Sequence, residues 1–515
     1  MATIGYEGQR YPGQAGETLL DTLLRHGAPV AHSCRKGSCG CCQVRLLAGE
    51  VEQGTAGGQA AEGHVLACVC RPLGEVSLAA ADLSQQPVDA ELVSRVALAP
   101  DIVELELAPY RELAFRAGQH VYLVREDGVS RPYSIASLPE DGYSFRIHVR
   151  EMAGGALSPW LCRDLAPGQR LKLRGPFGDF HLPADLPSDV PLLMVGTGTG
   201  AGALLGVLRE ALARGHRGPI GFFHGVRRPE DLYLDAALRL LASAHPQLDY
   251  QACVSGGSPS PGDQAGRALD RALGLFPALG QGRLFLCGHP RMVEQARVEA
   301  VRAGIPRGHV LADPFTLAAG ELPQDAAKLA ALAPEPEIWL LLGQGPGLTR
   351  LLEDFYGRVY ADPKLSPFFQ GVPVERAVQK QYEFLADVFT GKRSYFGLNP
   401  FNAHHWMVIS DELFDHREAL FAQVLAEHGV PEPMARRWLA IHELFRAELV
   451  KAAPRGLVTG GVEHPVRTQV VECLDIDAVC DGCQAEIPAG TPSRYLHRVG
   501  TLHCSACAGL GTAAA

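Results

Sequence analysis

Three cysteines near the amino terminus have the spacing of ligands to an iron–sulfur cluster. The run Cys34-x4-Cys39-x2-Cys42 matches the plant-type spacing that holds two irons and two sulfides. Gly37, Ser38 and Gly40 lie between these cysteines, and their small side chains let the loop wrap closely, so that backbone N–H groups reach the sulfurs. The run therefore predicts a 2Fe-2S cluster whose fourth thiolate comes from further along the chain.

Four cysteines near the carboxyl terminus have the spacing of a structural zinc site. The pairs Cys480-x2-Cys483 and Cys504-x2-Cys507 are separated by twenty residues. Two turns that each present a pair of thiolates predict a closed four-sulfur site, which leaves no open position for catalysis. His497 and His503 lie near the second pair, so a mixed ligand set stays open as an alternative.

The stretch Arg131-Pro132-Tyr133-Ser134 predicts a flavin-binding strand. An Arg, an aromatic ring and a hydroxyl at alternating strand positions offer a cation for a phosphate, a flat face for an isoalloxazine ring and a donor for its edge. An ordinary edge strand with an exposed Arg has the same pattern. The context favours the flavin, because a flavin accepts a hydride and releases single electrons, and the chain supplies candidates for both neighbours.

Two glycine-rich segments can hold phosphates. One of them is the run Gly196-Thr197-Gly198-Thr199-Gly200, which follows an apolar strand and precedes an apolar helix. A glycine turn in this position can bind phosphates at the helix N-terminus. Gly154–Ser158 ends in a serine that predicts a helix cap near Pro159, where a pyrophosphate would also fit. Cys287-Gly288 is expected at the carboxyl end of a strand, where ligands bind in parallel sheets, although a buried cysteine is the plain alternative.

The segments between these motifs predict the domains that position them. Gly175-Pro176-Phe177-Gly178 has turn chemistry and closes the predicted barrel region. Val-, Ile- and Leu-rich strands predict a small antiparallel barrel around the flavin strand, at residues 92–98 and 102–107. Apolar strands that alternate with helical stretches predict a parallel α/β sheet, with strands at 191–195, 220–223, 248–254 and 283–287.

The composition excludes several classes of protein. Lys plus Arg total 47 against 57 Asp plus Glu, a formal net charge of −10, which argues against a nucleic-acid-binding surface. No apolar run has the length of a membrane span, and the start lacks the basic and apolar regions of an export signal. Most of the 14 cysteines have ligand-like rather than disulfide-like spacing. We therefore expect a cytoplasmic protein with no membrane and no nucleic-acid partner.

Residues 1 to about 315 resemble the reductase components of bacterial ring-hydroxylating and related oxygenases, of the benzoate dioxygenase reductase type. In that family a ferredoxin precedes a ferredoxin-reductase-like module, and the motifs occur here in the same order. Leu66-Ala67-Cys68 is similar to the ferredoxin pattern for the fourth cluster ligand. The resemblance thus implies ligation by Cys34, Cys39, Cys42 and Cys68, with Cys41 and Cys70 as packed residues.

The same resemblance implies the cofactor-binding residues of the reductase. Those for FAD would be Arg131, Tyr133, Ser134, His148, Val149, Arg150, Gly155 and Ser158, with Phe315 covering the flavin. Those for the nicotinamide dinucleotide would be Gly196, Thr197, Gly198, Thr199, Gly200, Cys287 and Gly288. The family's glycine stretch usually ends in Ala-Pro, and here the chain departs from the family with Gly202-Ala203. Beyond Arg227-Arg228 there is no basic cluster for a 2′-phosphate, which favours NADH over NADPH.

Residues 338 to about 452 resemble truncated haemoglobins. A predicted helix has an apolar face made of Leu348, Leu351, Leu352, Phe355, Tyr356 and Val359. The resemblance is carried by the runs 354–363 and 366–369 and by Ala403-His404-His405-x3-Ile409-Ser-Asp-Glu-x-Phe414. It implies that His404 is the proximal ligand of haem b, that Phe369 packs on the haem and that Tyr356 and Gln381 are distal hydrogen-bond donors. Ala377 stands where many relatives carry a bulkier residue, which implies an open distal pocket.

His405 competes with His404 as the iron ligand. The family spacing to Ile409 and Phe414 fits His404, and a shift by one residue would turn the imidazole about 100° round a helix. His442 and Trp438, on the last predicted helix of the globin, are expected to pack rather than bind iron.

These predictions together give a multidomain chain of α+β and α/β parts. We expect a β-grasp 2Fe-2S ferredoxin at 1–84, an FAD-binding β-barrel at 88–183 and an NAD(P)-binding parallel α/β sheet at 190–316. An Ala-, Pro- and Glu-rich stretch predicts a linker at 317–337. An all-α truncated haemoglobin at 338–455 and a small four-cysteine zinc module at 470–515 follow.

The predicted cofactors form an electron chain in one polypeptide. NADH would reduce FAD, FAD would reduce the cluster, and the cluster or the flavin would reduce the haem. Haemoglobins fused to flavin reductases imply nitric oxide dioxygenation, with NADH, O2 and NO as small-molecule substrates. Two alternatives stay open: a reductase for a separate oxygenase, whose globin senses O2 or NO, and a globin that supplies O2 to such an oxygenase.

Overall fold

The computed structural model divides the chain into two compact units. One contains Met1–Ala319 together with Arg436–Leu444, and the other contains Gly320–Ala435 together with Phe445–Ala515. No helix among the described residues is long and apolar enough to cross a bilayer. The described residues are 2–14, 16–28, 30, 42–53, 63–80, 87–110, 113–315, 324–392, 398–451, 454–459, 462–463, 469–474, 477–496 and 501–510.

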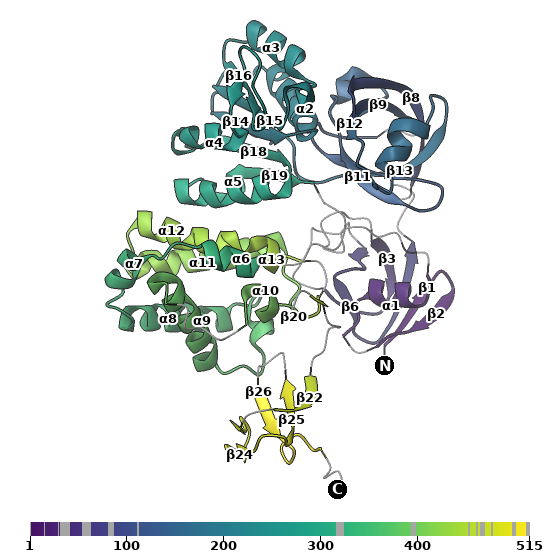
Figure 1. The fold of residues 1–515 in the computed structure, drawn as a ribbon. Helices are drawn as coiled ribbons and strands as arrows, with labels where there is room; N and C mark the ends of the chain where they lie inside the picture. Colours follow the sequence, from purple (N-terminus) through teal and green to yellow (C-terminus); the bar gives the residue numbers. More distant parts are fainter. Residues whose placement is uncertain are drawn as a thin grey trace. The chain divides into compact units, whose positions relative to one another are not determined.

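Among its described residues, the amino-terminal domain is a mixed sheet with one helix, as the β-grasp prediction requires (Figure 1). The helix α1 (Leu19–Arg25) begins at Thr18, whose hydroxyl accepts a hydrogen bond from the Asp21 backbone while Asp21 caps in return. The five-stranded sheet has the order β2-β1-β7-β3-β5, and a two-stranded sheet pairs β4 with β6. The strands are β1 (Thr3–Tyr6), β2 (Gln9–Pro12), β3 (Gln43–Ala48), β4 (Val51–Gln53), β5 (His64–Leu66), β6 (Cys70–Pro72) and β7 (Glu75–Ala80).

The second domain is an antiparallel barrel. Its strands follow the order β11-β10-β13-β8-β9-β12, and a bridge between Ile135 and Ile147 joins the two ends. Alternate residues of β12, namely Phe145, Ile147 and Val149, are buried in the barrel core. The strands are β8 (Val88–Ala99), β9 (Ile102–Pro109), β10 (His120–Val124), β11 (Ser130–Ser134), β12 (Phe145–Arg150) and β13 (Arg170–Phe177); short helical turns lie at η2 (Pro139–Asp141) and η3 (Trp160–Asp164).

The third domain is a six-stranded parallel sheet with helices packed against it. The strand order is β17-β16-β15-β14-β18-β19, so the chain moves outward from β14 on one side and then resumes on its other side at β18. The carboxyl ends of β14 and β18 therefore border the point where a ligand usually binds. The strands are β14 (Leu192–Thr197), β15 (Ile220–Val226), β16 (Leu248–Val254), β17 (Gln264–Ala265), β18 (Arg283–Gly288) and β19 (Val310–Pro314). The helices are α2 (Gly200–Ala213), α3 (Asp235–Ala244), α4 (Ala268–Ala272) and α5 (Pro290–Ala303), with turns η4 (Pro229–Asp231), η5 (Leu273–Ala278) and η6 (Arg307–His309).

The globin region is helical, as predicted. All six residues of the predicted apolar face are buried in α8, which packs against α9 and α11. The elements are α6 (Asp325–Ala331), α7 (Pro336–Leu341), α8 (Pro346–Ala361), η7 (Ser366–Phe369), α9 (Val374–Thr390), α10 (Pro400–Ala403), α11 (Asp411–Glu427), α12 (Glu432–Leu444) and α13 (Arg446–Leu449).

The carboxyl-terminal module consists of short antiparallel pairings. A three-stranded sheet has the order β22-β25-β26, and β20 pairs with β21 and β23 with β24. These strands are β20 (Val458–Thr459), β21 (Val462–Glu463), β22 (Gln469–Cys473), β23 (Ala478–Val479), β24 (Glu486–Ile487), β25 (Pro492–Leu496) and β26 (Thr501–Cys504).

Three local predictions were wrong. Gly175 to Phe177 form the end of β13 instead of a turn. Ser158 does not cap the helical turn at 160–164; its hydroxyl accepts a hydrogen bond from the Met152 backbone at 3.0 Å and closes the glycine loop on itself. Within the predicted linker, α6 is ordered because Asp325 is buried and accepts a hydrogen bond from the Phe401 backbone at 2.9 Å.

Candidate electron-transfer, haem and metal sites

The predicted dinucleotide seat is a tight glycine cradle at the carboxyl ends of β14 and β18. A Cβ on Gly200 would lie 2.4 Å from the Cys287 carbonyl oxygen, and one on Gly288 would lie 2.5 Å from the Thr197 carbonyl oxygen. The Thr197 hydroxyl accepts a hydrogen bond from the His289 backbone at 2.8 Å. Glycine at these positions lets the ends of β14 and β18 approach each other closely. The turn leads directly into the N-terminus of α2, whose backbone N–H groups fit a dinucleotide phosphate.

The predicted flavin strand and the dinucleotide sheet meet at one carboxylate. Ser134 Oγ donates to Asp313 Oδ2 at 2.7 Å, and Cys287 Sγ lies 3.8 Å from the same oxygen. Burial raises the pKa of the Cys287 thiol well above its ordinary value, so the thiol stays neutral. Asp313 was not predicted from the sequence, and its only signal is its place two residues before Phe315.

The four residues of the flavin stretch do not share one face, which corrects the alternating pattern assumed for them. Tyr133 packs against the barrel core, and burial raises the pKa of its phenol. Ser134 faces the opposite way and reaches Asp313, because neighbouring strand residues point to opposite faces. Arg131 is exposed and donates to the Ser130 carbonyl.

Arg174 is a further candidate for the FAD phosphates that the sequence did not reveal. It lies on β13, opposite Tyr122 of β10, and β10 also pairs with the flavin strand β11. Its buried Nε and Nη1 atoms have no hydrogen-bond partner among the described residues. Buried guanidinium donors of this kind fit a phosphate, so the barrel offers a site that suits FAD. The glycine loop packs tightly on itself, because a Cβ on Gly155 would lie 2.7 Å from Ser158 Oγ.

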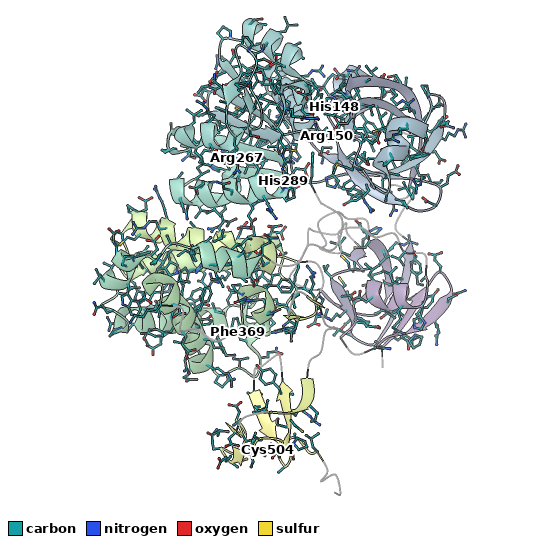
Figure 2. The ribbon with its side chains drawn as sticks, in the orientation of Figure 1. His148, Arg150, Arg267, His289, Phe369 and Cys504 are labelled. Carbon is teal, nitrogen blue, oxygen red and sulfur yellow. The ribbon has the colours of Figure 1, made fainter. Side chains whose placement is uncertain are left out.

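His148 and Arg150 both point away from the barrel core, while Val149 between them is buried in it. Figure 2 shows His148 and Arg150 at the side of the barrel that meets the dinucleotide-binding domain. His148 contacts Tyr233 of that domain, and Arg150 lies 3.6 Å from its Asp231. Side-chain contact of Val149 with FAD is therefore excluded by its burial, and the side chains of the other two residues lie toward the dinucleotide domain.

Two of the four predicted cluster ligands lie among the described residues. Cys42 and Cys68 are buried, and the pairing of β3 with β5 brings their segments together through a hydrogen bond from the Ala67 backbone to the Cys42 carbonyl at 2.9 Å. Burial raises the pKa of the Cys70 thiol to about 11, which suits a packed thiol better than a thiolate ligand. Cys34, Cys39 and Cys41 lie outside the described residues.

His404 has the geometry of a metal-ligating imidazole. It lies in the turn that ends α10, and its Nδ1 donates to the Pro400 carbonyl at 2.8 Å, which aims Nε2 away from the helix. Burial lowers the pKa of His404 to about 4, so the ring is neutral, as iron ligation requires. His405 Nδ1 likewise donates to the Asn402 carbonyl at 2.7 Å, but its side chain is 1% exposed, whereas His404 is only half-buried. This difference favours His404, because a haem ligand must face a cavity.

The predicted distal residues come together between α8 and α9. Tyr356 donates to Gln381 Oε1 at 3.4 Å, and the ring of Phe369 lies edge-on to Tyr356 with centroids 5.8 Å apart. Ala377 is buried on the same helix as Gln381. Trp438 and His442 are buried in α12, as packing residues should be. A phenol, an amide and an apolar ring in one place fit the polar distal side of a haem.

The segment after the last globin helix is hydrogen-bonded to the turn that carries His404. The Lys451 backbone donates to the Ile409 carbonyl at 3.0 Å, and the Arg455 backbone donates to the His405 carbonyl at 2.8 Å. Asn402 exchanges two hydrogen bonds of 2.9 Å with the backbone of Val458. The backbone on both sides of His404 is therefore held by residues that follow the last helix.

The four tail cysteines form a metal-binding group. The sulfurs of Cys480, Cys483, Cys504 and Cys507 all lie within 4.8 Å of one another, and those of Cys483 and Cys504 are 3.7 Å apart, which fits tetrahedral zinc. The Cys504 backbone donates to Cys480 Sγ at 3.3 Å and lowers the pKa of that thiol to about 6. His503 lies beside the group but outside it, and His497 lies outside the described residues.

Comparison with known proteins identifies four domains. Family models match residues 3–73 (2Fe-2S iron-sulfur cluster binding domain), 89–182 (oxidoreductase FAD-binding domain), 194–298 (oxidoreductase NAD-binding domain) and 338–450 (bacterial-like globin). These matches support FAD, NAD, a 2Fe-2S cluster and haem as cofactors, and the four-cysteine group supports zinc.

Reductase subunits and components of other enzyme systems match the first three domains. The chain is 35% identical over 306 residues to the reductase subunit of an Amycolatopsis aromatic O-demethylase, which covers 56% of this chain and 91% of the relative. It is 31% identical over 314 residues to the reductase component of the Pseudomonas putida naphthalene 1,2-dioxygenase system, covering 59% and 95%. A crystal structure of an Amycolatopsis cytochrome P450 reductase matches at 31% identity with a TM-score of 0.45, covering 62% and 99%. Over these residues the chain belongs to the family of 2Fe-2S flavoprotein reductases that includes the reductase components of oxygenase systems, and it continues into a bacterial-like globin.

Proposed function

We propose that this NAD-dependent oxidoreductase passes electrons from its reductase domains to its own haem, where NO and O2 are converted to nitrate. The observation that carries the proposal is the single chain itself, in which a complete reductase precedes a globin whose His404, Tyr356 and Gln381 are arranged for haem and ligand. The reaction balances when one electron joins each NO and O2 to give one nitrate, so one NADH serves two NO.

The reductase residues would bring the two organic cofactors together. When bound, NADH supplies a hydride with its two electrons, and FAD receives the hydride and releases the electrons singly to the cluster. Ser134 belongs to the flavin barrel and Cys287 to the dinucleotide sheet, and the Asp313 carboxylate accepts from both. This contact links the barrel to the dinucleotide sheet beside the fully buried Cys287.

The globin residues would hold the haem and its ligand. Haem, when bound, supplies an iron that binds O2 and changes oxidation state by one electron. His404 would hold the iron through Nε2, with Nδ1 fixed on Pro400. The Tyr356 hydroxyl would donate to a ligand on the distal side, where a partial negative charge needs a donor, and the small Ala377 would leave room for NO.

A second function is favoured by the relatives. The reductase subunits and components matched here serve a demethylase and a dioxygenase, so the chain would instead reduce a separate oxygenase. The globin would then sense O2 or NO, or supply O2, without being the end of the electron path.

The deciding experiment mixes the full chain anaerobically with NADH and follows the haem bands. Reduction without an added partner supports the internal path. Aerobic NO consumption is then measured with NADH, using the His404→Ala chain as a control that keeps the reductase. Consumption of two NO per NADH, lost in the control, is expected. NADH turnover that leaves the haem oxidised, or NO loss no faster than in the control, would reject the dioxygenase function in favour of the separate oxygenase.

Tyr356→Phe tests the distal donor. Removal of the hydroxyl should speed O2 release by about 5- to 150-fold, because one hydrogen bond to the ligand contributes about 1–3 kcal/mol. Flash photolysis measures the release. Tyr360→Phe is the matched control, since the Tyr360 hydroxyl donates to the Val372 carbonyl at 2.9 Å and should not reach the ligand. Equal release rates in both variants would remove Tyr356 from the distal site.

A further inference from the structure

We propose that His148 is the centre of a latch between the flavin barrel and the dinucleotide-binding domain, and that this latch sets the rate of hydride transfer without touching either cofactor. The latch consists of Glu104 on β9, His148 on β12 and Tyr233 in the turn before α3. It rests on the reductase half of the proposed function and is independent of the globin reaction. His148 would thus be a positioning residue and not a flavin ligand.

Both ring nitrogens of His148 are already in use. Nε2 lies 3.1 Å from Glu104 Oε2, and Nδ1 lies 2.9 Å from the Tyr233 hydroxyl. The hydrogen bond from His148 is the largest cause that lowers the pKa of the Glu104 carboxyl, so Glu104 is a carboxylate. A carboxylate can only accept, so Nε2 donates to Glu104, and Nδ1 is occupied by the Tyr233 hydroxyl. No ring nitrogen is left for a flavin.

The imidazole at the centre of the latch is buried, and the latch continues to the dinucleotide turn. The His148 side chain is 3% exposed. The Tyr233 ring lies edge-on to His148 at 5.3 Å and to His224 at 5.8 Å. His224 is fully buried, and burial lowers its pKa to about 4, so its neutral Nε2 donates to the Gly198 carbonyl at 3.2 Å. The rings of Tyr233 and His224 therefore connect His148 on the barrel to the glycine turn of the dinucleotide-binding domain.

Gly202 provides independent support for the latch. A Cβ at this position would lie 2.3 Å from His148 Nδ1 and 3.1 Å from the Tyr233 hydroxyl. Only glycine leaves space for the imidazole at this position.

The latch matters because the two reacting ligands would sit on different domains. The flavin site lies on the barrel at Ser134, and the dinucleotide cradle lies at Gly196–Gly200 and Cys287. Hydride transfer needs the reacting atoms about 3–3.5 Å apart, and a misplacement of 1 Å can cost about 100-fold in rate. In the Arg209–Asp141 contact between these domains, at 2.8 Å, the Arg209 side chain is 33% exposed, against 3% for the His148 side chain. Loss of the latch would leave the buried ring nitrogens of His148 unsatisfied.

The test compares Tyr233→Phe with Tyr250→Phe in the full chain. Tyr233→Phe removes the hydroxyl but keeps the ring between its neighbours. Tyr250 is the matched control, because its hydroxyl bonds Asp235 at 3.1 Å inside the same domain. We measure FAD content, hydrogen exchange of segments 145–150 and 229–234, and anaerobic flavin reduction at saturating NADH. Tyr233→Phe should keep its FAD, exchange faster in both segments and reduce about 10-fold more slowly. Tyr250→Phe should match the wild type.

Two further substitutions keep the test decisive if Tyr233→Phe folds poorly. Gly202→Ala should give the same exchange and rate changes, with Gly274→Ala as its control, since a Cβ at Gly274 meets nothing within 4 Å. Glu104→Gln keeps an acceptor and should preserve the rate, whereas Glu104→Leu should not. Loss of FAD from Tyr233→Phe or Gly202→Ala, or wild-type exchange and rate in both, would overturn the latch. Failure of NADH to reduce the wild-type flavin would instead refute the reductase function.

Discussion

At the scale of single residues, burial distinguishes two adjacent histidines that could hold a haem. His404 and His405 both donate Nδ1 to a backbone carbonyl, so their hydrogen bonds do not separate them. His405 is 1% exposed, whereas His404 is half-buried. The family spacing and this difference in burial both favour His404, whose ligation of the iron stays a prediction.

We predict that His404→Ala abolishes haem binding while His405→Ala retains it. The Soret absorbance per chain and the haem content after gel filtration measure the outcome. Imidazole in the buffer should restore haem to His404→Ala, because the ring is lost but the cavity is kept. The assignment fails if His405→Ala is the variant that loses haem and imidazole restores it there.

Glu17 predicts a pH dependence in the ferredoxin domain. Its carboxylate accepts from Arg25 Nε at 2.7 Å and from the Thr22 hydroxyl at 2.8 Å. The Arg25 hydrogen bond is the largest cause that lowers the pKa of Glu17 from 4.5 to about 2. Because the folded pKa is lowered, the ionised carboxylate stabilises the fold above the unfolded pKa, and this stability is lost as the pH falls from about 4.5 toward 2.

Glu17→Gln should remove that pH dependence. The thermal midpoint of the cluster's visible circular dichroism, measured in steps from about pH 6 to about pH 3, should fall more steeply in the wild type than in the variant. Glu52→Gln is the control, since Glu52 is exposed on β4 and should behave as the wild type. Parallel curves for Glu17→Gln and wild type would contradict the prediction.

At the scale of elements, regular periodicity was predictable and local loop chemistry was not. The apolar face of α8 was predicted residue by residue, because the spacing of its apolar residues follows the 3.6-residue period of an amphipathic helix. The parallel strands were found because buried strands are continuous apolar runs. Ser158 was misassigned because capping and loop closure use the same hydroxyl, and only the position of Met152 distinguishes them.

The residues of the candidate sites also fall into a predictable and an unpredictable group. The cysteine pairs and glycine turns were predictable because their ligands are close in sequence. Asp313, Arg174 and the partners of His148 were not, because they approach from elsewhere in the chain: 179 residues separate Ser134 from Asp313, and 85 separate His148 from Tyr233. No local sequence pattern predicts a contact between residues so far apart in the chain.

The four-cysteine element predicts its own metal dependence. Cys504→Ser should reduce zinc from about one per chain to none and should speed hydrogen exchange across residues 477–496, since metal binding contributes to folding in such modules. Cys473→Ser is the matched control, because Cys473 is exposed in the same module and outside the metal-binding group. Iron in place of zinc, or zinc retained in Cys504→Ser, would disprove the closed zinc site.

At the scale of the whole molecule, covalent connection is the property that distinguishes this chain from its relatives. Those relatives match only its first three fifths, and the globin follows in the same polypeptide. A tethered acceptor meets its donor at an effective concentration that does not change on dilution.

We therefore predict that NADH-driven haem reduction is first order and independent of protein concentration. Stopped-flow measurement of the haem bands over a wide dilution series tests this. Mixing a His404→Ala chain, which keeps the reductase, with a Cys42→Ser chain, which keeps the globin, provides the control. Haem reduction faster in that mixture than in the Cys42→Ser chain alone, or a rate proportional to concentration, would show transfer between chains and contradict the internal path.

Where the globin can be cut out of this chain depends on the hydrogen bonds to the turn around His404. Lys451, Arg455 and Val458 make these bonds. The globin match ends at residue 450, and the three residues that make these bonds all lie beyond it. A globin cut out at residue 450 would lose these contacts around His404, the predicted iron ligand. The smallest unit that can be moved intact to another protein is therefore expected to be longer than the matched domain.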